Sequence, residues 1–233
     1  TEAVDGGGEQ AMTGAWGAEG GVFSILVGID VEQLAYTITG NLVETSFTKG
    51  ATDYPTMVKW SDVTQANQVP PSWDETDPTT SAGENVLVDM TGSIVDGGAL
   101  RNEFIIYGSQ ETYLMEFVGP PFIFSFRRLF SDDGVINTNC YVEVGGKDYV
   151  FGTKDIYVHD GVQKQSIADG RVRTAIFSAL NKKKANRCFV AHNENYNEIE
   201  FCYVSTELEV EFPTTAYANV AAVYNYVTDN WTF

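Results

Sequence analysis

The stretch EFIIYGSQETYLME, residues 103–116, recurs 44 residues later as KDYVFGTKDIYVHD, residues 147–160. Each copy has an apolar strand pattern, a polar turn that begins with glycine, and a second strand of aromatic and aliphatic residues, which predicts a β-hairpin. A period of roughly 40–50 residues made of short strands is typical of propeller blades. The repeat therefore predicts a β-propeller. Seven pairs of identical or similar residues match at this offset: Tyr107 with Phe151, Gly108 with Gly152, Ser109 with Thr153, Glu111 with Asp155, Tyr113 with Tyr157, Leu114 with Val158, and Glu116 with Asp160.

Short apolar segments, separated by glycine, proline and polar turns, extend this pattern on both sides of the repeat. They predict strands at residues 22–29, 34–43, 57–61, 85–90, 94–95, 104–107, 113–117, 122–130, 140–144, 149–151, 156–159, 163–167, 187–191, 199–204, 207–212, 220–226 and 231–233. The predicted fold class is all-β, with blades of short antiparallel strands and one short helix. We group the strands into a partial β-propeller domain over residues 22–233, with blade-like units near 22–92, 93–136, 137–180 and 185–233.

The helix is predicted at Asp169–Asn181, where apolar residues recur at helical spacing and Asp169 can cap the first turn. Lys182–Lys184 follow this segment. We interpret these lysines as cations that complement the negative carboxyl end of the helix. A patch that contacts phosphate is the alternative interpretation.

Two segments lack a strand pattern. Residues 1–21 are rich in glycine and predict a flexible loop or connection between structured parts. Asp62–Glu84 is polar, contains Trp73, and is long for a loop within a compact domain, so we expect it to contact a neighbouring subunit or another component of the assembly. The chain begins without methionine and its last hairpin is short, which predicts part of a longer protein and of a larger propeller.

The charge of the chain is strongly negative. It has 14 Lys and Arg against 32 Asp and Glu, a formal net charge of −18. Such a surface repels phosphate at long range, which argues against sequence-specific DNA binding. It suits a virion or extracellular protein, or a surface past which nucleic acid slides. Simple colloidal solubility explains the same charge.

No catalytic, cofactor-binding or metal-ligating residues are predicted, and we expect no enzyme activity. His159 matches Met115 of the other repeat copy, which favours a packing or surface position, and His192 lies in a polar turn without a second metal ligand nearby. Asp132-Asp133 lacks the alternation of an EF-hand loop and predicts a turn. The cysteines lack metal or disulfide spacing and are expected to be small buried hydrophobes: Cys140, Cys188 and Cys202.

The aromatic residues of the repeat suit either a sugar-stacking surface or the core between blades. Their alternation within strands favours the core. The residues concerned are Tyr107, Tyr113, Phe151 and Tyr157. No apolar run reaches the roughly 18 residues of a membrane-spanning helix, so no membrane span is predicted.

The segment Thr112–Gly161 resembles the tail-hub or nozzle proteins of short-tailed bacteriophages, a family also called tail tubular protein B. The similar features are an aromatic hairpin, the linker Gly119–Phe122, the segment Phe126–Arg128, and a Gly-Gly hairpin that closes in Asp-Gly. The chain is shorter than the family pattern, and its glycine-rich opening departs from it. Other similar segments extend the resemblance over residues 55–233: Lys59–Asp62, Trp73, Asp169–Leu180, Val223–Tyr226 and Trp231.

This resemblance implies a structural virion protein of the phage tail. Such proteins are β-propeller subunits that assemble as a homo-oligomer, usually a hexamer, into a tube or nozzle for genome ejection. The implied partners are tail adaptor or portal-proximal ring proteins, tail fibres or spikes, and double-stranded DNA that passes without sequence-specific binding. The alternative is a carbohydrate-binding or carbohydrate-cleaving β-propeller used in host attachment. A sensor propeller of a cell is a third possibility.

Overall fold

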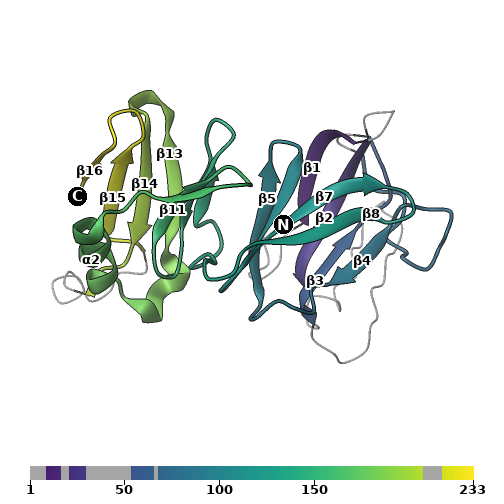
Figure 1. The fold of residues 1–233 in the computed structure, drawn as a ribbon, viewed down its shortest axis with the longest axis horizontal. Helices are drawn as coiled ribbons and strands as arrows, with labels where there is room; N and C mark the ends of the chain where they lie inside the picture. The colour runs from purple at the N-terminus through teal and green to yellow at the C-terminus, as the bar shows by residue number, and fades with distance from the viewer. Residues whose placement is uncertain (1–8, 17–20, 30–53, 66–67, 207–216) are drawn as a thin grey trace. The chain divides into compact units, whose positions relative to one another are not determined.

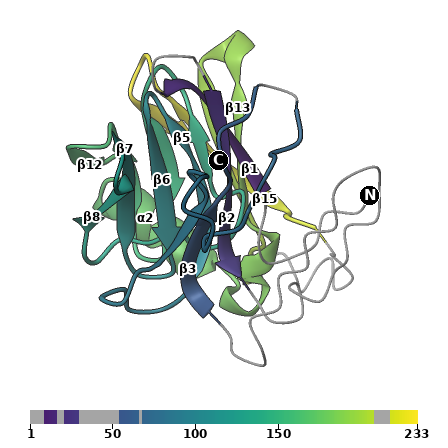
Figure 2. The ribbon, with the colours of Figure 1, turned by 90° about the vertical axis from the view of Figure 1, so that its right-hand side faces the viewer.

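The computed structural model describes residues 9–16, 21–29, 54–65, 68–206 and 217–233, with side chains described from residue 54 onward. Within these ranges the chain forms four sheets of four strands (Figure 1). In every sheet the strand order follows the order along the chain, which can be traced for β5, β6, β7 and β8 in Figure 2. The fold is all-β with few helices, as the sequence predicts.

The four sheets are named here by their order along the chain. The first sheet contains β1 (Glu9–Trp16), β2 (Gly21–Ile29), β3 (Tyr54–Trp60) and β4 (Gly83–Val86). The second contains β5 (Ile94–Leu100), β6 (Glu103–Gly108), β7 (Thr112–Gly119) and β8 (Ile123–Phe130). The third contains β9 (Tyr141–Glu143), β10 (Asp148–Phe151), β11 (Ile156–His159) and β12 (Lys164–Ser166). The fourth contains β13 (Phe189–Asn193), β14 (Glu198–Tyr203), β15 (Val220–Asn225) and β16 (Asn230–Thr232).

The chain divides into two compact units, Thr1–Arg128 and Leu129–Phe233. The first unit holds the first sheet and all of the second except the last two residues of β8. The second unit holds the other two sheets, the helix α2 (Gly170–Ala179), and two short 3-10 helices, η1 (Lys182–Arg187) and η2 (Glu194–Tyr196).

The two repeat copies form equivalent hairpins, because each joins the second and third strands of its sheet. The last strand pair before the turn is Tyr107 with Thr112 in one hairpin and Phe151 with Ile156 in the other. Each turn is closed by the repeated glycine. Its backbone N–H donates to a carbonyl three residues on, at 2.8 Å from Gly108 to Glu111 and at 2.9 Å from Gly152 to Asp155.

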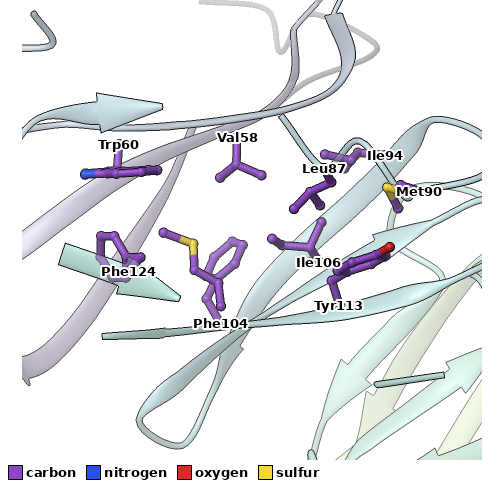
Figure 3. Packing of buried hydrophobic residues seen from close by; sticks show 10 residues of the cluster. Val58, Trp60, Leu87, Met90, Ile94, Phe104, Ile106, Tyr113 and Phe124 are labelled. Carbon is purple, nitrogen blue, oxygen red and sulfur yellow. The ribbon is translucent and has the colours of Figure 1, made fainter. Parts of the chain in front are cut away.

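The core of the first unit lies between its two sheets (Figure 3). Trp60 of β3 faces Phe124 of β8 across this layer, and the rings meet edge to face. The indole Nε1 of Trp60 donates to the Ser81 carbonyl at 2.9 Å, so its only polar atom is satisfied inside the core. The buried cluster consists of Val58, Trp60, Leu87, Met90, Ile94, Phe104, Ile106, Tyr113, Met115 and Phe124.

The core of the second unit is built from aromatic rings of the third and fourth sheets. Phe151 of β10 meets Phe201 of β14 at 5.9 Å between centroids and at right angles. Tyr149 lies 6.3 Å from Tyr224 of β15. The last hairpin is tied to the third sheet, since Trp231 Nε1 donates to the Ile167 carbonyl at 2.9 Å. Face-to-face packing of consecutive sheets thus occurs in both units.

Two expectations from the sequence differ from the structure. The segment predicted as a loop over residues 1–21 contains a strand, because residues 9–16 form β1 and pair with β2. The strand expected at residues 85–90 is shifted, since β4 spans Gly83–Val86. Leu87 and Met90 nevertheless lie in the buried core beyond its end. The strands expected at 34–43 and 207–212 lie outside the described residues.

Candidate functional site

The aromatic residues of the repeat do not form an exposed stacking surface. Tyr107 and Phe151 are fully buried, and Tyr113 and Tyr157 are buried as well. Tyr113 belongs to the core of the first unit, whereas Phe151 packs on rings of the fourth sheet. The prediction that these four residues form core is confirmed.

His159 is a buried packing residue with a polar surrounding. Its ring lies 5.3 Å from Phe130 and 6.0 Å from Tyr157 between centroids. The Gly161 N–H donates to its Nδ1 at 3.3 Å, and its Nε2 lies 3.9 Å from the Asp148 carboxylate. Burial lowers the pKa of His159 from 6.5 to about 4, against the opposing charge of Asp160. The imidazole is therefore neutral at pH 7.

A small pocket of about 150 Å³ borders His159 at the β11–β12 turn. Its polar lining includes Lys147, Lys164 and Asp160. Lys164 pairs with Asp133 and lies over the rings of Phe130 and Tyr157. Asp133 is thus half of an ion pair. Within the described ranges, no group of three or more His, Cys, Asp or Glu side chains has the arrangement of a metal site.

The second histidine lies in a strand, which corrects the turn expected from the sequence. His192 belongs to β13 and pairs with Ile199 of β14, and the turn begins at Glu194. Its Nε2 lies 3.2 Å from the hydroxyl of Tyr226. Among the described residues, the His192 ring has no other hydrogen-bond partner. This arrangement is a structural cross-link within the fourth sheet.

All three cysteines are buried free thiols, as the sequence predicts. Burial raises the pKa of Cys188 and of Cys202 to about 11 in each case. These thiols therefore stay protonated at neutral pH, and a protonated thiol is a poor nucleophile and metal ligand.

The long polar segment Asp62–Glu84 folds back on the end of β3. Buried Lys59 lies 2.5 Å from Glu75 and 3.9 Å from Glu84, so the segment supplies the counter-charges of a cation that is 3% exposed. Asp62 accepts a hydrogen bond from the Ser81 N–H at 2.8 Å. Trp73 of the same segment is buried. The segment is therefore part of the first unit, and it presents its acidic residues from fixed positions.

The predicted helix is confirmed as α2. The Asp169 carboxylate caps it by accepting from the N–H groups of Arg171 at 2.9 Å and Val172 at 2.8 Å. The expectation that Lys182–Lys184 complement its carboxyl end stays a prediction. The last turn of α2 contains no basic residue, and the three lysines lie in the separate helix η1, beyond the C-cap Leu180.

The helix α2 and the 3-10 helix η1 together carry six basic residues. We call this group the basic face: Arg171, Arg173, Lys182, Lys183, Lys184 and Arg187. All six residues lie on α2 or η1, and only Lys184 among them is partly buried. The sequence signal that identifies the face is the lack of any Asp or Glu from residue 170 to residue 193. Sequence reasoning that treats the lysine triplet alone misses the three arginines.

Comparisons with known proteins do not assign the chain to a family. No protein-family model matches it, and no curated protein is significantly similar in sequence. No helix in the described part of the chain has the length and apolar character needed to cross a membrane.

Proposed function

We propose that this chain is a structural virion protein of a short-tailed bacteriophage, in which copies of the chain form the tail tube or nozzle. The tube conducts the genome during ejection, and the chain acts as a β-propeller subunit without enzyme activity. The observation that carries the proposal is the series of four consecutive four-stranded sheets, each with its strands in chain order. This is the strand order of propeller blades.

Packing supports the blade interpretation within each unit. Consecutive blades of a propeller pack face to face through apolar side chains. Trp60 and Phe124 make such a contact between the first and second sheets, and Phe151 and Phe201 make one between the third and fourth. A ring needs about 4–8 blades.

The charge of the chain supports a passive conduit. Duplex DNA carries one negative charge per about 1.7 Å of axis, so cations along its path would retard it. A chain with a net charge of −18 offers few such contacts overall. The partners in this proposal are other copies of the chain, the adaptor or portal-proximal ring, and tail fibres or spikes.

The attachment propeller has less support, because sugar binding by a propeller requires exposed aromatic rings. The repeat aromatics Tyr107, Tyr113, Phe151 and Tyr157 are all buried. No other observation in the described ranges favours a carbohydrate site.

Electron microscopy of the purified chain, together with native mass spectrometry, tests the proposed function. We expect closed rings with a central channel and a defined copy number, usually six in the family that the chain resembles. An electrophoretic assay with a duplex of random sequence should show no retardation at physiological salt. A chain that stays monomeric at the highest attainable concentration, or that degrades polysaccharide, would contradict the proposal.

A further inference from the structure

The charge of this chain is segregated. The segment Gly170–Arg187 carries six of the 14 basic residues and none of the 32 acidic ones, so the rest of the chain has a net charge of −24. A single-sign patch of this kind creates a local field opposite to that of the surrounding surface. Such a field orients and attracts a surface of the opposite sign.

The basic face is held rigidly. Ile176 of α2 is fully buried, and Phe177 packs on Phe151 with 5.8 Å between ring centroids. The end of α2 is tied to the segment that directly follows β14, because the Asn181 N–H donates to the Val204 carbonyl at 2.8 Å. The Thr206 hydroxyl donates to the Ala179 carbonyl at 3.1 Å. A rigid face loses little conformational entropy when it docks.

Three of the six cations of this face have no carboxylate partner in the described ranges. Arg173 pairs with Asp155 at 3.5 Å. Lys182, Lys183 and Arg187 form no ion pair with any carboxylate in the described ranges. The next strand adds an apolar element, since Phe189 of β13 is 41% exposed beside Arg187. An exposed aromatic residue next to cations is the composition expected of a protein–protein contact.

The first unit offers a surface of complementary charge. The segment Asp62–Glu84 contains five acidic residues and no Lys or Arg. Asp74 is exposed and Asp77 is half-buried, and their carboxylates accept hydrogen bonds from the N–H groups of Thr76 and Thr79, both at 2.9 Å. The Thr79 hydroxyl also donates to Asp77, and this bond, with the weaker effect of the N–H bond, lowers the pKa of Asp77 and keeps its carboxylate ionised.

We infer that the basic face docks on the Asp62–Glu84 segment of a second copy of this chain. The contact is heterologous, because two different surfaces meet, and heterologous contacts generate rings when their rotation closes. This inference rests on the proposed function, to which it adds the surfaces through which copies join. A second copy fits better than DNA because the rest of this chain, at −24, repels a duplex but attracts the basic face of another copy.

Charge reversal tests the inference, with sedimentation velocity as the readout of assembly. The variant K182E/K183E places carboxylates on the basic face. The control K147E/K154E changes the net charge by the same amount at two exposed lysines outside it. We expect at least tenfold weaker self-association for K182E/K183E and little change for the control, because like charges in contact are strongly unfavourable. Both variants should unfold at the wild-type temperature, since only exposed side chains change.

The reciprocal variant D74K/D77K should also fail to assemble by itself. An equimolar mixture of D74K/D77K and K182E/K183E should assemble again. In the mixture the two substituted surfaces have opposite charges, and so do the two unchanged surfaces. Restoration by mixing requires contacts between different copies. Self-association of the wild type should weaken as salt is raised, as expected for exposed charges.

Three outcomes overturn the inference. If the wild type forms rings and neither reversal affects them, the contact lies elsewhere and the proposed function stands. If the wild type never assembles at any salt concentration, the inference and the proposed function both fail. If the wild type retards a duplex DNA and K182E/K183E abolishes that binding without altering assembly, the basic face is a nucleic-acid contact.

Discussion

Trp60 and Phe124 meet edge to face with their ring centroids 5.3 Å apart and an interplanar angle of 76°. Trp60 ends β3 of the first sheet, and Phe124 lies near the start of β8 of the second. Edge-to-face pairs add about 0.5–1.5 kcal/mol beyond the burial of their surface. This contact joins two sheets that share no strand.

Removing the ring of Phe124 should strongly destabilise the first unit. Phe124 is 4% exposed, so the Phe124→Ala variant loses its burial and leaves a cavity against Trp60. We expect a loss of about 3–5 kcal/mol in the free energy of unfolding, measured by urea denaturation. Phe122→Ala is the matched control, because Phe122 is 77% exposed and should change stability by less than about 0.5 kcal/mol. Equal effects of the two substitutions would contradict this packing.

The repeated glycine of the second hairpin, Gly152, should be required because other backbone atoms lie close to its Cα. A Cβ at Gly152 would lie 2.9 Å from the Asp155 carbonyl oxygen and 3.0 Å from that of Gly134. Gly152→Ala should therefore destabilise the second unit by about 1–3 kcal/mol. Gly170→Ala, where no atom lies within 4 Å of the added Cβ, should be neutral or stabilise α2 by up to about 1 kcal/mol. Thermal unfolding compares the two, and a harmless Gly152→Ala would refute the turn geometry.

Acid should destabilise the chain through His159. Its pKa is about 6.5 when unfolded and about 4 when folded, so the unfolded state binds the extra proton between these values. The contribution of neutral His159 is intact above pH 6.5 and is lost as the pH falls toward 4, by up to about 3 kcal/mol. The nearby carboxylates of Asp148 and Asp160 oppose this loss.

The measurement for His159 is urea unfolding at pH 7 and pH 4.5 for the wild type and for His159→Gln. The decrease between the two pH values should be smaller in His159→Gln, because that variant has no buried imidazole to protonate. His192→Gln serves as the control and should follow the wild type. The comparison between variants cancels the effect of the many surface carboxylates, which protonate in all of them. Identical pH dependence in His159→Gln and wild type would count against a buried neutral histidine.

The cysteines should resist thiol reagents in the folded chain. Cys188 and Cys202 have pKa values raised to about 11, so little thiolate exists at pH 8, and all three cysteines are buried. We expect slow reaction with a chromogenic disulfide reagent in buffer and rapid release of three equivalents in urea. Rapid reaction of the folded chain would show that the thiols are accessible.

The strands that sequence reasoning locates well have turns with distinctive chemistry. Glycine at positions 108 and 152 fixes the two repeat hairpins, and Asp169 fixes the start of α2 through its capping bonds. These signals are local, so single residues specify them. By contrast, β1 has the sequence EQAMTGAW, with little apolar alternation, and becomes a strand because β2 supplies its hydrogen-bond partners.

The candidate surface is predictable only in part, since charge is visible in a sequence and exposure is not. The lysine triplet stands out by composition, but the exposure of Arg171 depends on which side of α2 is buried. Burial of Ile176 decides that side. Likewise, the counter-ions of Lys59 are Glu75 and Glu84. Their separations from Lys59 along the chain are ones that no helix or hairpin spacing would indicate.

Because every described ladder of strands is built from one continuous stretch of chain, the gene can gain or lose whole sheets by tandem duplication or deletion. Such an event breaks no existing ladder, and the match between residues 103–116 and 147–160, at an offset of 44 residues, is the trace that an old duplication would leave. Recombination at sheet borders is thus a route to chimaeras with an altered number of sheets.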